Sequence, residues 1–114
     1  VLKRGGLLLN FDANWYRYLY DEEARRGYME DREHIRRSGV ADETDGTDIP
    51  AMEAIAGKAP LSGCVRPQWD LDILRRLGMD AVADEDIWKT VWTREERINN
   101  GSTPMFMIKA VKRL

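Results

Sequence analysis

Cysteine and histidine are nearly absent from this chain of 114 residues, which has one of each, Cys64 and His34. A single cysteine excludes an internal disulfide bond and suits a reducing compartment, so the sequence predicts a cytoplasmic protein. No histidine lies near Cys64 in the sequence to activate its thiol, and we interpret this residue as incidental. His34 lies in a strongly charged stretch, and we interpret it as a solvent-facing side chain rather than a catalytic base.

Long apolar runs and an excess of positive charge are missing as well. No run approaches the roughly 20 apolar residues that a membrane-spanning helix needs. The formal net charge is −2, and 33% of the residues are charged, so the composition implies no basic face. We therefore expect neither a membrane nor a nucleic acid as a partner.

The sequence does contain a glycine pair, Gly5 and Gly6, near its start. It is followed by an apolar run over residues 7–9 that leads into Asn10, Phe11 and Asp12. Glycine tolerates the left-handed conformation that ends a helix, so residues 1–4 are expected to form the last turn of one. A short continuous apolar run is typical of a strand buried on both faces. The chain is therefore expected to be a fragment that begins at a joint between a helix and a strand.

Two helical stretches are predicted next. Residues 14–38 are rich in charge and end at Gly39, and either Asn14 or Asp21 is expected to cap a helix in this stretch. A second helix is predicted from Pro50, which fits a first turn, to Gly57.

The polar loop between these helices contains three aspartates, Asp42, Asp45 and Asp48. A calcium loop needs ligands at fixed alternate positions and a later bidentate glutamate, and this spacing does not supply them. We therefore interpret the loop as solvated, with Thr47 or Asp48 capping the helix that follows.

The last part of the chain predicts one helix and two strands. Residues 68–77 carry an apolar stripe and are followed by Gly78, which predicts an amphipathic helix. Strands are predicted within residues 79–88 and over 104–113, and Thr93 opens a Thr-x-x-Glu capping box for a short helix between them. Trp88 and Trp92 are expected to pack under the sheet edge. Helices beside apolar strands indicate an α/β fold.

These motifs, in this order, resemble the C-terminal part of class I S-adenosylmethionine-dependent methyltransferases. Residues 2–14, with Arg4 where the family usually has proline, resemble the entry into the fifth strand. Residues 69–78 resemble the last helix, and residues 102–112 resemble the antiparallel seventh strand. The resemblance implies a Rossmann-like sheet of strands five, six and seven over residues 1–114, with residues 14–66 as a helical insertion or substrate lid.

The resemblance also implies a strand order of first, last, middle. The first strand then forms an apolar edge that a neighbouring strand covers in the family. Unpaired apolar edges are templates for pairing with another chain, so we expect this chain to self-associate.

Candidate substrate-binding residues lie at the carboxyl end of the first strand, where ligands bind in open α/β sheets. They are Asn10, Asp12, Asn14, Trp15 and Tyr16. In the alternative interpretation Asp12 or Asn14 caps a helix, and Trp15 and Tyr16 cover the core. The sequence identifies no catalytic base.

The resemblance implies S-adenosylmethionine as the cofactor and a small-molecule methyl acceptor as the substrate. The family holds the cofactor with a glycine-rich loop after strand one and an acidic residue after strand two. This chain contains no Gly-x-Gly pattern, so we expect it to be inactive alone and the intact enzyme to transfer the methyl group. The alternative is a self-contained small α/β domain that binds a partner and catalyses nothing.

Overall fold

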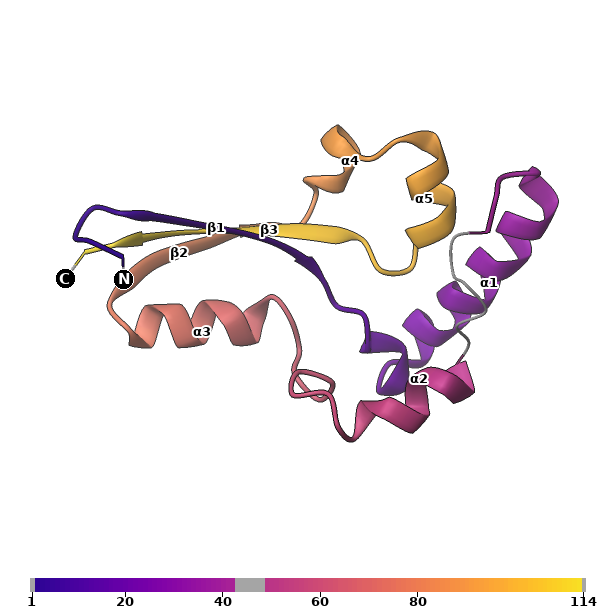
Figure 1. Ribbon diagram of the computed structural model, residues 1–114, viewed down its shortest axis with the longest axis horizontal. Coiled ribbons are helices and arrows are strands. Elements are labelled where there is room, and N and C mark those ends of the chain that lie inside the picture. The colour runs from indigo at the N-terminus through magenta and orange to yellow at the C-terminus, as the bar shows by residue number, and fades with distance from the viewer. Residues whose placement is uncertain (1, 43–48, 114) are drawn as a thin grey trace.

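The computed structural model describes residues 2–42 and 49–113, which form one three-stranded sheet and the helices around it (Figure 1). The fold is mixed α/β, as the sequence predicts. The elements in chain order are β1 (Leu7–Ala13), the 3-10 turn η1 (Arg17–Leu19), α1 (Glu22–Ser38), α2 (Ile49–Ala56), α3 (Gln68–Arg76), β2 (Met79–Asp84), α4 (Trp88–Val91), α5 (Arg94–Asn100) and β3 (Met105–Lys112).

The strands are ordered β1-β3-β2, so the last strand of the chain lies between the other two. β3 is antiparallel to both neighbours, with Leu7 opposite Val111 in one pair and Ala81 opposite Ala110 in the other. β1 and β2 therefore run in the same direction. The predicted order of first, last, middle is confirmed, and so is the antiparallel direction of the last strand.

The helix ends follow local signals in the sequence. Asp21, not Asn14, caps α1, because its carboxylate accepts the backbone N–H groups of Glu23 and Ala24. Gly39 ends α1 with a φ of 74°, in the left-handed region. Thr93 forms the predicted capping box at the start of α5.

The expected helical turn at the start of the chain is wrong for residues 2–4, which are not helical. Gly5 does adopt a left-handed φ of 78°, but in a turn that leads into the sheet. Its N–H donates to the carbonyl oxygen of Lys112 at 2.7 Å. The glycine is therefore needed where β1 begins beside the end of β3.

The two faces of the sheet are covered unequally. Ala81, Ile108 and Ala110 are buried on the face toward α3. Large apolar side chains are exposed on the opposite face: Leu7, Leu9, Phe11 and Val82. The prediction that β1 is buried on both faces is therefore wrong for the described part of the chain, because a continuous apolar run does not reveal whether both faces have a covering layer.

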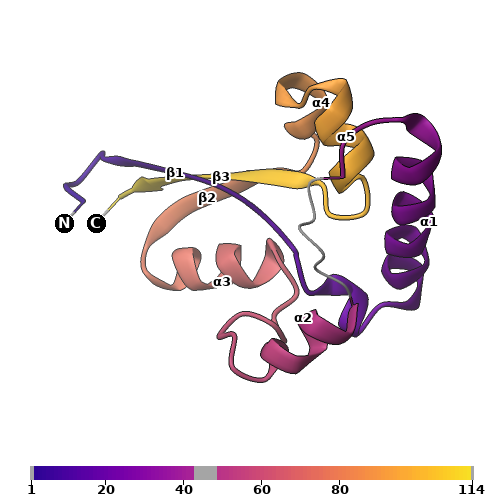
Figure 2. The same ribbon diagram turned by 45° about the vertical axis from the view of Figure 1, so that its right-hand side comes forward.

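The remaining helices gather beyond the carboxyl end of β1 (Figure 2). Helices α1 and α5 contact each other, and each contributes a buried isoleucine, Ile35 and Ile98. Trp88 and Trp92 contact each other, with ring centroids 5.8 Å apart. The radius of gyration is 16.1 Å, whereas a compact domain of this length has about 13 Å. The sheet and the helical group thus form an elongated molecule with its open side at β1.

Candidate functional site

Four of the five predicted site residues line one cavity at the carboxyl end of β1. This β1-end cavity has a volume of about 540 Å³. Its lining residues are Asp12, Ala13, Asn14, Trp15, Tyr16, Ala59, Pro60, Leu61 and Arg66. Asn10 is separated from it and lies in a smaller hollow between β1 and α3, beside Trp69.

A buried arginine, Arg66, lines this cavity and holds two carboxylates in place. The Arg66 side chain is only 7% exposed and donates to both carboxylate oxygens of Asp70, at 2.8 and 3.0 Å. It also donates to Oδ2 of Asp12 at 2.7 Å and lies over the Phe106 ring, 5.4 Å from its centroid. Hydrogen bonds to Asp70 and then Asp12 raise the pKa of Arg66 above its ordinary value. One cation thus joins β1, α3 and β3.

Asp12 is consequently a positioning group. Its Oδ2 accepts from Arg66, and its Oδ1 accepts the backbone N–H of Ala13 at 2.8 Å. With both oxygens engaged, the carboxylate orients the chain where β1 leads toward η1.

Asn14 orients the adjacent loops instead of capping a helix. Its side-chain amide donates to the Tyr20 hydroxyl at 2.7 Å and to the carbonyl oxygen of Arg66 at 3.5 Å. The alternative in which Asp12 or Asn14 caps a helix is therefore wrong. Trp15 remains about half exposed, so it forms a cavity wall more than a cover for the core.

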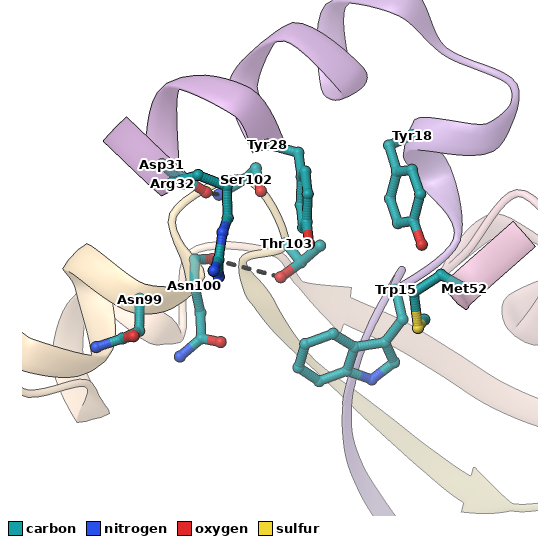
Figure 3. A pocket seen from close by; sticks show the side chains of 10 residues that line it. All are labelled: Trp15, Tyr18, Tyr28, Asp31, Arg32, Met52, Asn99, Asn100, Ser102 and Thr103. Carbon is teal, nitrogen blue, oxygen red and sulfur yellow. Dashed lines mark hydrogen bonds between the residues drawn. The ribbon is translucent and has the colours of Figure 1, made fainter. Parts of the chain in front are cut away.

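A second cavity, drawn in Figure 3, shares Trp15 with the β1-end cavity. This tyrosine cavity has a volume of about 310 Å³. Its lining residues are Trp15, Tyr18, Tyr28, Asp31, Arg32, Met52, Asn99, Asn100, Ser102 and Thr103. The rings of Tyr18 and Tyr28 are stacked, with centroids 5.2 Å apart and planes inclined by 24°.

The hydroxyl group of Tyr18 is buried without a hydrogen-bond partner in the described part of the chain. Burial, reinforced by the neighbouring tyrosines, raises the pKa of Tyr18 to about 12. The group is therefore a neutral phenol throughout the physiological pH range, and it can donate a proton to an acceptor.

Sequence reasoning missed Arg66 and Tyr18. The available signal for Arg66 was its spacing of four from Asp70, which favours an ion pair on a helix face. Tyr18 belongs to a run of alternating tyrosines, 16, 18 and 20, that carries no comparable signal. His34 is exposed, as predicted, and Cys64 is a free thiol.

Within residues 2–42 and 49–113 no group of three His, Cys, Asp or Glu side chains is placed to hold a metal ion. Asp42 pairs with Arg32 at 2.7 Å, while Asp45 and Asp48, as well as Thr47, lie outside the described residues. None of the described helices combines the length and the apolar character needed to cross a membrane.

No protein-family model, curated protein or solved structure matches this chain. Its function must therefore be argued from its own residues.

The described residues do not fit the S-adenosylmethionine site of the family that the sequence resembles. That site needs a glycine-rich turn between a strand and the helix that follows it. The segments that lead from β1 into η1 and α1, and from β2 into α4, contain no glycine, and Gly5 and Gly6 precede β1. Any cofactor site would have to be built by other residues.

Proposed function

We propose that this chain provides the methyl-acceptor side of a cytoplasmic class I S-adenosylmethionine-dependent methyltransferase that acts on a small molecule. The observation that carries the proposal is the sheet, in which antiparallel β3 lies between β1 and β2, which run in the same direction. The family arranges its fifth, seventh and sixth strands in this way, and β1, β3 and β2 would correspond to them.

The β1-end cavity supports an acceptor-binding role. It lies beyond the carboxyl end of a strand, where open α/β sheets bind their ligands. Trp15 and Tyr16 give it an aromatic wall, while Arg66 fixes Asp12. Methyl transfer is an in-line displacement that depends above all on positioning, and a rigid wall of this kind would position an acceptor.

The exposed face and edge of β1 agree with the same proposal. In the family a further strand pairs with this edge, and helices cover both sheet faces. Here β1 is the edge strand, and Leu7, Leu9 and Phe11 are half exposed. We also propose that this surface makes the 114-residue chain self-associate.

Calorimetry is expected to detect no saturable binding when S-adenosylmethionine is titrated into the 114-residue chain, because its described residues do not build the cofactor site. The complete gene product should bind it in the micromolar range, about 8 kcal/mol of binding free energy. Micromolar binding by the chain alone would contradict the site assignment. Absence of binding by the complete gene product would contradict the proposed function.

Replacing Trp15 with alanine in the complete gene product should lower methyl transfer to the acceptor by tenfold or more, because the cavity loses its aromatic wall. Trp69→Ala is the matched control, since Trp69 is similarly exposed but lies outside the β1-end cavity. Steady-state kinetics with labelled cofactor measure the loss of activity, and thermal unfolding of both variants measures any loss of stability. If Trp15→Ala and Trp69→Ala lose activity equally, and each loss is proportional to the loss of stability, Trp15 contributes to packing alone.

The second candidate is a self-contained domain that binds a partner protein, and the exposed apolar face of β1 favours it. The gene discriminates between the two. An upstream reading frame that encodes a glycine-rich βαβ unit supports the methyltransferase, whereas a start codon directly before Val1 supports the binding domain.

A further inference from the structure

The tyrosine cavity has the walls of a small-molecule site. Trp15, Tyr18, Tyr28 and Met52 form its apolar side (Figure 3). Its volume of about 310 Å³ lies at the lower end of the range for ligand pockets, about 300–1,000 Å³. Aromatic walls favour a planar guest, because an aromatic ring can stack against them or meet their edges.

The Tyr18 hydroxyl gives this cavity a donor in need of an acceptor. The Tyr18 residue is only 4% exposed, and its oxygen has no partner within the described residues. In Figure 3 the hydroxyl points to the side of the cavity where Trp15 and Met52 lie. Buried polar groups are nearly always hydrogen-bonded in native proteins, so an orphaned one indicates a missing partner.

The charged groups around the cavity are already engaged. Arg32 donates to Asp42 at 2.7 Å, and the Asp31 carboxylate accepts the backbone N–H of Ser102 at 2.6 Å. An anionic ligand would have to break the Arg32–Asp42 ion pair or leave its own charge without a counterpart, and a cationic group cannot accept the hydrogen bond that the Tyr18 hydroxyl offers. The cavity therefore favours an uncharged ligand.

We propose that the tyrosine cavity binds a neutral, planar aromatic ligand whose acceptor atom receives a hydrogen bond from Tyr18 Oη. The ligand stacks within the Trp15–Tyr28 wall, and its acceptor completes the hydrogen bonding of the phenol. Met52 is unbranched and flexible, so a change of its rotamer admits the ligand to the hydroxyl. This site shares Trp15 with the β1-end cavity, but its other lining residues differ and it does not depend on methyl transfer.

Quinoline and naphthalene test this proposal, because they have the same shape but only quinoline carries an acceptor nitrogen. Each is titrated into the 114-residue chain and followed by NMR through the ¹³C-labelled methyl groups of methionine. Both should shift the Met52 signal in a saturable way, with quinoline binding more tightly. Tyr18→Phe, which removes only the hydroxyl, should weaken quinoline binding by about tenfold and leave naphthalene binding unchanged.

Tyr16→Phe is the matched control, since Tyr16 lines the β1-end cavity and not the tyrosine cavity. It should leave both affinities unchanged. The proposal is overturned if neither compound shifts Met52 saturably, if Tyr18→Phe weakens both compounds equally, or if Tyr16→Phe has the same effect as Tyr18→Phe. None of these outcomes depends on a methyl-transfer activity, so they are separate from a failure of the proposed function.

Discussion

Replacing Arg66 with methionine is expected to lower the free energy of unfolding by about 3–5 kcal/mol, because removal of one partner leaves a buried charge uncompensated. Asp70, whose side chain is 10% exposed, would lose the cation that donates to both of its oxygens. Asp12 would lose its link to the loop before α3, and Phe106 would lose the cation above its ring. Denaturation with urea, followed by far-ultraviolet circular dichroism, measures the change.

Arg37→Met is the control for the Arg66 substitution. Arg37 pairs with Glu33 at 2.9 Å, but its side chain is 77% exposed, and exposed ion pairs contribute about 0–1 kcal/mol. If Arg66→Met costs no more than Arg37→Met, the buried ion cluster does not hold the β1-end cavity together. In that case the cavity wall must depend on apolar packing.

Sedimentation of the 114-residue chain is expected to show concentration-dependent association through the exposed side of β1, and Phe11→Lys is expected to weaken it. Phe11 is 51% exposed on the edge strand, and its cross-strand neighbour is the uncharged Met107. The lysine therefore has no like charge directly opposite it, since Lys109 of β3 lies opposite Leu9. Loss of Phe11 burial at the contact should cost roughly 1.5–3 kcal/mol of association free energy, and a charged edge opposes strand pairing.

Val91→Lys provides the comparison for Phe11→Lys. Val91 is also half exposed, but it lies on α4, away from the β1 edge. It should leave association unchanged. A concentration-independent monomer for the unmodified chain would show that the open side of β1 does not mediate self-association. Equal effects of the two substitutions would place the contact elsewhere.

Local signals determined where α1 begins and ends and where α5 begins. Asp21 and Thr93 are helix caps because a side-chain oxygen satisfies backbone N–H groups two or three residues further along the chain. Gly39 ends α1 because glycine accepts a positive φ. Such interactions depend only on neighbouring residues, and the sequence displays them directly. The strand order was also predictable, but through the family resemblance and not through any single residue.

The candidate site was predictable only in part. The sequence predicted that Asp12, Asn14, Trp15 and Tyr16 lie together at the end of β1, because they are close in the chain, and all four line the β1-end cavity. Asn10 shares a sheet face with Asp12, yet α3 lies over Asn10 while Arg66 reaches Asp12. The direction of β1 alone could not distinguish these two environments.

The tertiary structure alone decided what surrounds each of these residues. Arg66 meets Asp12 across 54 positions of the chain, and no local pattern specifies such a distant pair. Tyr18 and Tyr28 stack because η1 packs against α1, which places a buried hydroxyl beside a cavity. The apolar run of β1 determined that a strand would form. Which of its faces is covered depended on the position of α3, since burial is a property of neighbouring layers and not of the strand itself.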